Sequence, residues 1–387
     1  MNLELSEEQS AVRDLAASFT DREIVPYAAE WDRVESVDRA IIGKLAEVGF
    51  LGLTIPEEYG GSGGDHLAYC LVLEELGRGD SAVRGIVSVS LGLVGKSINS
   101  FGTEEQKQHW LPRLTSGQAL GCFALTEPGT GSDAANLTTR AVRDGEDWLI
   151  SGAKMFITNG TWADVALVFA RTGGSEPDQQ GHRGITAFLV PTDLPGFTRT
   201  EIHGKLGLRG QATAELSFDG VRVPDSARLG AVGKGFTVAM AALAKGRMSV
   251  AAGCVGIARA CLEAAVRYAG EREQFGRPIA SHQLVQQLLA GIAVDVEAAR
   301  LLTWKVADHI ERGLPFATES SVAKLHASEA AVRAANNALQ VFGGYGFIDE
   351  YPVGKYLRDA RVMTLYEGTS QIHELLIGRA LTGVNAF

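Results

Sequence analysis

The sequence predicts an α+β multidomain protein with an N-terminal α-helical domain, a middle antiparallel β-barrel domain and a C-terminal four-helix bundle. Apolar residues recur with a helical period up to about residue 118. They form short strand-like runs from 119 to 230 and return to the helical period from 231 to 387. With 387 residues, of which 45% are hydrophobic, the chain can also bury more than one core.

The N-terminal domain, residues 1–118, is expected to be helical. Ser6 and Gln9 have the spacing of a capping box, and apolar residues follow them at helical intervals. Further runs with this period occupy residues 38–49, 66–78, 81–101 and 103–115. The glycine-rich segment 56–65 is predicted to be a loop.

The middle domain, residues 119–230, contains short runs rich in β-branched or aromatic residues, separated by turn signals. These runs occupy residues 148–150, 165–170, 185–190 and 214–223. They predict a compact antiparallel barrel or sandwich. The C-terminal domain, residues 231–387, returns to long helical runs at 236–269, 281–312, 316–340 and 371–381. The first would be about 50 Å long, which suits an antiparallel bundle.

Composition and charge exclude several classes of protein. The net charge of −10 without a basic cluster argues against nucleic acid as the main partner. No run approaches the roughly 20 consecutive apolar residues of a membrane span, and the first six residues lack a basic segment and an apolar signal core, so we expect a cytoplasmic protein. The eight histidines lack metal-ligand spacing, so no metal site is expected. Four scattered cysteines are interpreted as buried free thiols: Cys70, Cys122, Cys254 and Cys261.

The segment YEGTSQ at the C-terminal end places one carboxylate, Glu367, beside a glycine and three hydrogen-bonding side chains. Gly368 lets backbone approach a ligand closely, while Thr369, Ser370 and Gln371 can donate hydrogen bonds to an anionic or carbonyl-rich cofactor. These residues alone leave two interpretations of Glu367 open. It is either a catalytic base, or a solvated or N-capping acid at a helix beginning with Gln371.

The sequence LTEPGTGSD at 125–133 can form one wall of a cofactor site. Its small residues, Gly131 among them, let backbone N–H groups converge, and Thr126 and Ser132 supply hydroxyls. The alternative is a β-turn that links a helix to a strand.

Two further segments carry weaker signals. Phe156 and Thr158 would share one face of a strand, where the ring and the hydroxyl could contact a ligand; the alternative is an ordinary strand end. Arg272 can grip two oxygens of a diphosphate, and Gly343-Gly344 permits close backbone approach to the same anion. The alternatives are a surface ion pair and a helix C-cap.

The order of these motifs resembles the acyl-CoA dehydrogenase family over essentially the full chain. The matching segments are LTEPGTGSD at 125–133, FITNG at 156–160, LGLRG at 206–210, REQFG at 272–276, QVFGGYG at 340–346 and YEGT at 366–369. The resemblance implies non-covalently bound FAD and α,β-dehydrogenation of an acyl-CoA thioester to the trans-2-enoyl-CoA. In that reaction Glu367 abstracts the α-proton and flavin N5 accepts the β-hydride.

The resemblance also implies the binding residues and the partners. The residues expected to contact FAD are Phe123, Leu125, Thr126, Gly131, Ser132, Phe156, Thr158, Arg272, Phe275, Gln283, Gln340, Gly343, Gly344, Thr369 and Gln371. Those expected to contact the substrate are Ser132, Arg247 and Gly368. In the family, Arg272, Phe275 and the 340–344 loop grip the FAD of a neighbouring subunit, which implies a homotetramer built as a pair of dimers. Electrons are expected to leave to an electron-transfer flavoprotein.

Some choices stay open. Isovaleryl and long-chain members carry the base on the bundle helix just before an arginine, but this chain has Gly246 before Arg247, which favours Glu367. Family members often have Trp at Phe156 and an acid at Ala244, which leaves the electron acceptor and the contacts to CoA in question. The alternatives are an acyl-CoA oxidase using O2, an acyl-carrier-protein thioester dehydrogenase and, remotely, a non-catalytic acyl-CoA-binding factor. The run at 101–108 resembles short-chain members more than medium-chain ones, which favours a short or branched acyl chain.

Overall fold

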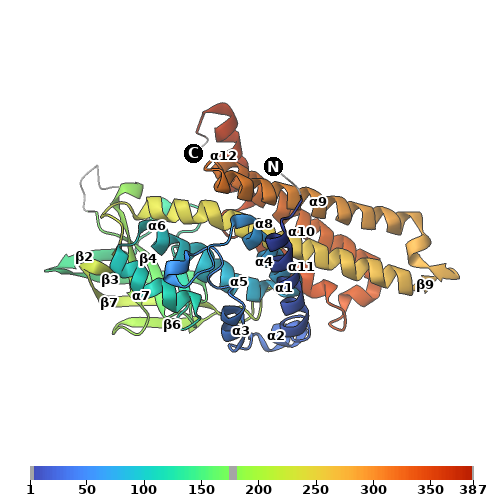
Figure 1. Ribbon diagram of the computed structural model, residues 1–387, viewed down its shortest axis with the longest axis horizontal. Coiled ribbons are helices and arrows are strands. Elements are labelled where there is room, and N and C mark those ends of the chain that lie inside the picture. Colours follow the sequence, from blue (N-terminus) through green and yellow to red (C-terminus); the bar gives the residue numbers. More distant parts are fainter. Residues whose placement is uncertain (1–3, 174–180, 386–387) are drawn as a thin grey trace.

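Helices form the two outer parts of the chain and strands form the middle part, as the sequence predicts (Figure 1). The computed structural model describes residues 4–173 and 181–385, so the first three residues of the N-terminal segment lie outside it. The changes in character expected near residues 118 and 230 fall in the connections 116–120 and 230–234. The exact domain boundaries stay a prediction.

The N-terminal helices confirm the runs predicted at 38–49, 66–78, 81–101 and 103–115 and add one short helix. They are α1 (Glu7–Glu23), α2 (Ala28–Val34), α3 (Ile41–Glu47), α4 (His66–Gly79), α5 (Ser81–Val89), α6 (Lys96–Phe101) and α7 (Glu104–Thr115). Ser6 forms the predicted capping box with Gln9, and the helix that the sequence did not predict is α2. A π-helical turn, Ser90–Gly95, joins α5 to α6 within the run predicted as one helix. Such turns are frequent near functional sites.

The middle part is an eight-stranded sheet. Its strands are β1 (Gly121–Ala124), β2 (Arg140–Asp144), β3 (Asp147–Thr158), β4 (Val165–Arg171), β5 (Ile185–Pro191), β6 (Phe197–Glu201), β7 (Thr213–Pro224) and β8 (Arg228–Leu229). They pair in the order β6-β7-β3-β2-β4-β5-β8, and β1 pairs with β4. Most pairs are antiparallel, but β1 runs parallel to β4 and a parallel pair of residues, Arg140 and Arg171, joins β2 to β4. A parallel pair requires a long crossover connection, and the segment with the β2–β3 hairpin between β1 and β4 supplies it.

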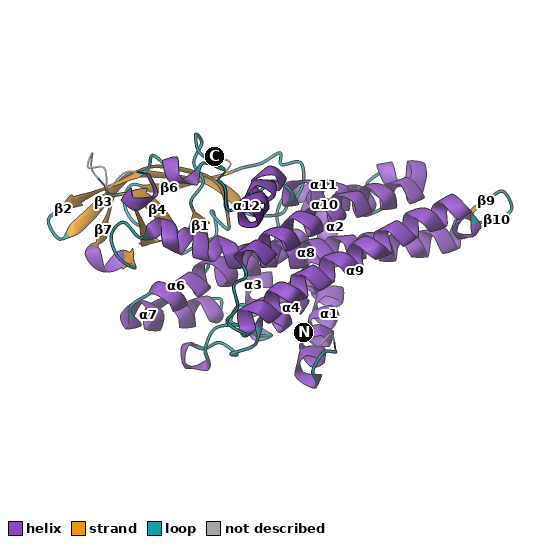
Figure 2. Cartoon of the chain, turned by 90° about the horizontal axis from the view of Figure 1, so that it is seen from above, coloured by secondary structure: helices purple, strands orange, loops and turns teal. Residues whose placement is uncertain are grey.

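The C-terminal part contains the four predicted helical runs and one helix that was not predicted, α11. The helices are α8 (Gly235–Glu271), α9 (Gln283–Glu311), α10 (Ala317–Phe342), α11 (Val353–Met363) and α12 (Ser370–Thr382). A short hairpin of β9 (Glu273–Gln274) and β10 (Arg277–Pro278) joins α8 to α9. Figures 1 and 2 both place this hairpin at the end of the molecule opposite the sheet.

The two helical parts share one hydrophobic core. Helix α4 packs on α8, and a Cβ added at Gly77 would lie 2.7 Å from the carbonyl oxygen of Gly253, so glycines let these helices approach closely. Residues of α1, α4, α8, α9 and α10 belong to the same buried cluster. Helices from both ends of the chain therefore form one packed support for the candidate site described below.

Two helical stretches, Ser81–Phe101 and Gly235–Glu271, are long and apolar enough to cross a membrane by length and composition. Their most apolar windows are 100% and 78% buried inside the protein, and core helices of this kind pass the same test. All four cysteines are buried and unpaired in the described protein, which confirms the prediction made for them.

Candidate functional site

Glu367 lies in the loop of residues 364–369 between α11 and α12, which we call the base loop. Helix α12 begins at Ser370, one residue before the predicted start, and its N-cap is Thr369, whose hydroxyl accepts from the N–H of Ile372 at 3.3 Å. Glu367 has a φ of 52°, a left-handed conformation that costs about 1–2 kcal/mol for a residue with a side chain. Thr369 rather than Glu367 caps the helix, and the backbone strain at Glu367 is typical of a functional position.

The carboxylate of Glu367 is enclosed. Its Oε2 is buried and has no hydrogen-bond partner among the described residues. Burial raises the pKa of Glu367 to about 7, and the positive charges of Arg84, Lys324 and Arg247 oppose that rise in decreasing order. A carboxyl group with this pKa exchanges a proton readily at neutral pH.

The loop around Glu367 is held from the bundle. Lys324 on α10 donates a hydrogen bond from Nζ to the carbonyl oxygen of Gly368 at 2.6 Å. Gly368 has a φ of 103°, and a Cβ there would lie 2.9 Å from Nε2 of His373, so only glycine fits. Arg247 on α8 is half-buried; its Nη1 lies 3.5 Å from Oγ of Ser321 and its Nε has no acceptor in the described part of the chain. Burial lowers the pKa of Arg247, and the charge of Glu367 opposes that fall.

Helix α8 forms the wall that faces Glu367. A Cβ added at Gly246 would overlap Oε2 of Glu367 and would lie 2.8 Å from Cδ2 of Leu93. The carboxylate therefore fills the space that a side chain at position 246 would need. Leu93 belongs to a small apolar cluster with Val89, Ala242 and Phe123.

The end of β3 carries the two residues predicted to face a flavin. Phe156 has a φ of 60° and is 67% exposed, next to an irregularity of the β3–β7 ladder between Lys154 and Ile157. Ile157 is buried and Thr158 is half-buried, so burial alternates as the sequence predicts. Thr158 donates to Oε1 of Gln211 at 3.3 Å. Phe156 is thus an exposed aromatic residue in an energetically costly backbone conformation, which suits a side chain that packs over the ring of a bound ligand.

A buried ion pair that the sequence analysis missed fixes the 125–133 segment. Glu127 lies 2.9 Å from Nζ of Lys154 and accepts from the N–H groups of Thr138 and Thr139 at 2.6 and 2.8 Å. Burial would raise the pKa of Glu127, but Lys154 and these hydrogen bonds lower it to about 2. The sequence feature that could have indicated this ion pair is an acidic residue, Glu127, inside a glycine-rich segment.

The remainder of that segment stays accessible. Leu125 is buried and its carbonyl accepts from Lys154, whereas Thr126 is half-buried. Gly131 and Ser132 are exposed, and a Cβ added at Gly131 would meet nothing within 4 Å. We call the predicted cofactor residues on β1, β3 and this segment the strand group. They are Phe123, Leu125, Thr126, Gly131, Ser132, Phe156 and Thr158.

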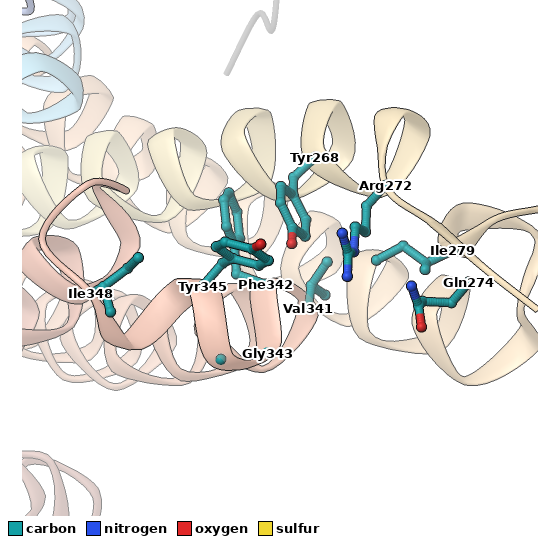
Figure 3. Close-up of a pocket in the computed structure, with 10 residues that line it drawn as sticks. Tyr268, Arg272, Gln274, Ile279, Val341, Phe342, Gly343, Tyr345 and Ile348 are labelled. Carbon is teal, nitrogen blue, oxygen red and sulfur yellow. The ribbon is translucent and has the colours of Figure 1, made fainter.

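Six of the other predicted cofactor residues gather at the far end of the bundle, beside the β9–β10 hairpin. We call this the tip group; it consists of Arg272, Phe275, Gln283, Gln340, Gly343 and Gly344, and all six are exposed. A pocket of about 460 Å³ lies here, lined by Arg272 and Gly343 with Tyr268, Phe342 and Tyr345. In Figure 3, Tyr268 and Arg272 extend from the end of α8 toward Val341, Phe342 and Tyr345.

The hairpin at the tip lies outside the chain's own core. Phe275 and Gly276 have φ angles of 56° and 73° and form the two-residue turn of the hairpin. Phe275 is 94% exposed. The guanidinium of Arg272 lies 5.4 Å from the ring centroid of Tyr345. Since the hairpin and the sheet lie at opposite ends of the molecule, the structure does not bring the tip group and the strand group together within one chain (Figures 1 and 2).

The residues present fit FAD. Open backbone at Gly131, Gly343 and Gly344 leaves space within 4 Å for a ligand, and Arg272 is an exposed guanidinium that can bind phosphate. Among the other predicted contacts, Thr369 is half-buried and Gln371 is exposed at the start of α12.

Comparison with known families matches the whole architecture. The N-terminal, middle and C-terminal domains of acyl-CoA dehydrogenases match residues 6–118, 122–221 and 233–382. The chain is 45% identical to an acyl-CoA dehydrogenase of Bacillus subtilis (strain 168) over 381 residues, which covers 98% of this chain and 100% of the relative.

Solved structures give the same result. One described as the electron transferring flavoprotein of Acidaminococcus fermentans is similar with a TM-score of 0.96 and 41% identity, covering 99% of this chain and 100% of that one. A glutaryl-CoA dehydrogenase from Mycobacterium smegmatis in complex with FADH2 is similar with a TM-score of 0.94 and 38% identity, covering 99% and 96%.

Proposed function

The chain belongs to the acyl-CoA dehydrogenase family and is an FAD-dependent acyl-CoA dehydrogenase, and we propose that Glu367 is the base that abstracts the α-proton of the acyl thioester. One observation carries this assignment. The Oε2 atom of Glu367 is buried, lacks a partner within the described residues and belongs to a carboxyl group whose pKa is raised to about 7.

The chemistry requires a carboxylate in these surroundings. The α-proton of a thioester is weakly acidic, so the base must hold it at a defined atom in a site from which water is excluded. Glu367 takes the proton on a carboxylate oxygen, and its own backbone N–H is proposed to donate to the thioester carbonyl. The apolar cluster of Val89, Leu93, Ala242 and Phe123 would line the path of the acyl chain. When bound, FAD supplies the acceptor for the hydride that leaves the β-carbon.

Two groups of residues would hold the cofactor. The strand group would bind the flavin half, with Phe156 covering the ring and Thr158 offering its hydroxyl. The tip group would bind the diphosphate through Arg272 and the backbone of Gly343 and Gly344. Because these groups lie at separate ends of one chain, we propose that each FAD is held by two subunits of a homotetramer. Sedimentation velocity of the purified protein at several concentrations tests the assembly.

The electron acceptor is proposed to be an electron-transfer flavoprotein, which the similar structure described under that name supports. An acyl-CoA oxidase would share Glu367 and the flavin site but let O2 reoxidise the reduced enzyme. A stopped-flow comparison of reoxidation by air and by an electron-transfer flavoprotein separates the two. A location in the cytoplasm is also a proposal, to be tested by cell fractionation.

The acyl group is proposed to be short or branched and carried by CoA, with a carrier-protein thioester as the alternative. Direct mixing tests the proposed function as a whole. The purified protein is expected to be yellow, and its flavin absorption is expected to bleach when a thioester is added without air. A panel of thioesters on CoA and on carrier protein then ranks the substrates. A protein without flavin after expression in flavin-replete cells would support the non-catalytic factor instead.

A further inference from the structure

Arg84 on α5 is a buried cation that the reaction described above does not use. It is 1% exposed and is the largest fully buried side chain in the described protein. A guanidinium stays charged at every physiological pH, and burying a charge without an anionic partner is costly. Such a residue requires an explanation from its surroundings.

The protein supplies Arg84 with neutral partners. Its Nη1 donates to Oγ of Ser88 at 3.1 Å and its Nη2 donates to the hydroxyl of Tyr366 at 2.5 Å. Its Nε has no acceptor among the residues described. Arg84 forms no ion pair with any acidic residue in the described ranges 4–173 and 181–385. A guanidinium has five N–H groups, so most of its hydrogen-bonding capacity is unused by the chain.

Arg84 lies close to two segments of the proposed site. Tyr366, which it contacts, immediately precedes the proposed base. The next residue, Gly85, packs against Gln211. A Cβ added at Gly85 would lie 3.8 Å from Cγ2 of Thr158, which belongs to the strand group. On the other side, Gly253 of α8 leaves the room that the Arg84 side chain occupies, because a Cβ there would lie 2.5 Å from its Cδ. Arg84 therefore sits between the base loop and the strand group.

The charges around the base do not balance. Three cations, Arg84, Arg247 and Lys324, interact with the single carboxylate of Glu367. Arg84 exerts the strongest effect of the three. Once Glu367 has taken a proton, the carboxylate that acts on Arg84 and Arg247 is neutral, whereas Lys324 still interacts with Glu329.

We propose that Arg84 is a specificity-determining residue that binds a carboxylate at the far end of the acyl chain, so that the substrates are thioesters of dicarboxylic acids. This inference rests on the proposed function. A substrate carboxylate would accept charge-assisted hydrogen bonds from the N–H groups that the protein leaves free. A plain alkyl chain would leave the guanidinium unpaired, and sites that hold buried polar groups reject ligands that lack the partner.

In a different role, Arg84 would not touch the substrate and would only hold Tyr366, which makes it a positioning residue for the base loop. The two roles differ in one measurable respect. Positioning affects every thioester alike, whereas recognition of a carboxylate affects only the chain that carries one.

Binding is measured first, without turnover. The flavin-loaded Glu367→Gln tetramer is titrated with glutaryl-CoA and with pentanoyl-CoA, which have equal carbon number and differ at the terminal carboxylate or methyl. We expect glutaryl-CoA to bind at least about tenfold more tightly, because its carboxylate accepts charge-assisted hydrogen bonds from Arg84. Equal Kd values, or tighter binding of pentanoyl-CoA, would overturn the proposal.

The arginine is tested next in the same background. Arg84→Met keeps the length of the side chain without the charge, and it is expected to abolish the preference for glutaryl-CoA while pentanoyl-CoA binds as before. Ser88→Ala removes one neutral contact and keeps the guanidinium, so the preference should persist. A loss of affinity for both thioesters in equal proportion would assign Arg84 to positioning. If Arg84→Met does not fold, the Kd ratio in the Glu367→Gln protein still decides.

Flavin bleaching of the wild-type enzyme separates the two hypotheses. Bleaching by glutaryl-CoA at a kcat/KM at least about tenfold that of pentanoyl-CoA supports both. Bleaching by pentanoyl-CoA with no advantage for glutaryl-CoA would overturn the role of Arg84 and leave the dehydrogenase intact. Bleaching by neither, nor by other thioesters, would overturn the proposed function itself.

Discussion

The base loop and the tip group are both predicted to bind ligand, yet they differ in burial. Around Glu367 the polar groups are enclosed, and two of them, the Glu367 carboxylate and the Arg84 guanidinium, lack the partners that buried charges require. At the tip, Phe275 and Gly343 are open to solvent. Non-glycine residues with positive φ occur in both places, at Glu367 and Phe275. Buried groups without partners fit a ligand held within one chain, whereas the exposed tip fits the proposal that the FAD is shared with another copy.

The largest of three effects expected from this comparison tests its enclosed side. Gly246→Ala places a methyl group where Oε2 of Glu367 lies, so the carboxylate must move. Displacing a general base costs about 10² or more in rate. Anaerobic stopped-flow bleaching measures it, with flavin content confirmed. The matched control is Gly270→Ala on the same helix, where an added Cβ meets nothing within 4 Å. A Gly246→Ala rate within about threefold of wild type would show that the carboxylate does not act from this position.

The second largest effect tests the exposed tip group. Arg272→Ala removes a charge-assisted bond to the proposed diphosphate, so FAD should bind at least about tenfold more weakly and the assembly should dissociate on dilution. The flavin-to-protein ratio and the mass in solution report the two consequences. Arg267→Ala, an exposed arginine on the same helix, is the control. Normal FAD content and mass in the Arg272→Ala protein would remove this residue from the site.

The smallest effect sharpens the account of the base. Because burial raises the pKa of Glu367 to about 7, the active carboxylate form is lost below that pH. The bleaching rate under kcat/KM conditions should fall about tenfold per pH unit below pH 7 and level off above it. Arg84→Met should move the inflection to higher pH, since Arg84 lowers the pKa of Glu367. A profile that stays flat between about pH 5 and pH 8 would contradict the assignment.

Much of the fold could be predicted because its periodicity is strong. The long helices α8, α9 and α10 have apolar positions at helical spacing, and all three were located within a few residues. Helix α11 was missed because it is short, contains Gly354 and buries few apolar residues. The parallel pairing of β1 with β4 could not be predicted, because strand direction depends on tertiary connections rather than on local pattern.

Site residues can be proposed from the sequence where side chains in a local motif carry the chemistry, as at Glu367 and Thr158, and their roles stay predictions. Arg84 was missed because a single arginine in an apolar run gives no sign that it will be buried without an anion. Glu127 and Lys154 were missed as a pair because 27 residues separate them in the chain. Only the packing of α5 against α8 and of β3 against the 125–133 segment reveals these contacts.

The central claim is that Glu367 abstracts the α-proton, and one variant tests it most directly. Glu367→Gln keeps the size and much of the hydrogen bonding of the side chain but cannot accept a proton at neutral pH. The variant, with flavin occupancy confirmed, is mixed without air with a thioester that bleaches the wild type. Since Gly246 offers no second carboxylate, we expect bleaching to slow by about 10⁴ or more, the upper end for removal of a general base. Bleaching within about tenfold of the wild-type rate would show that Glu367 is not the base.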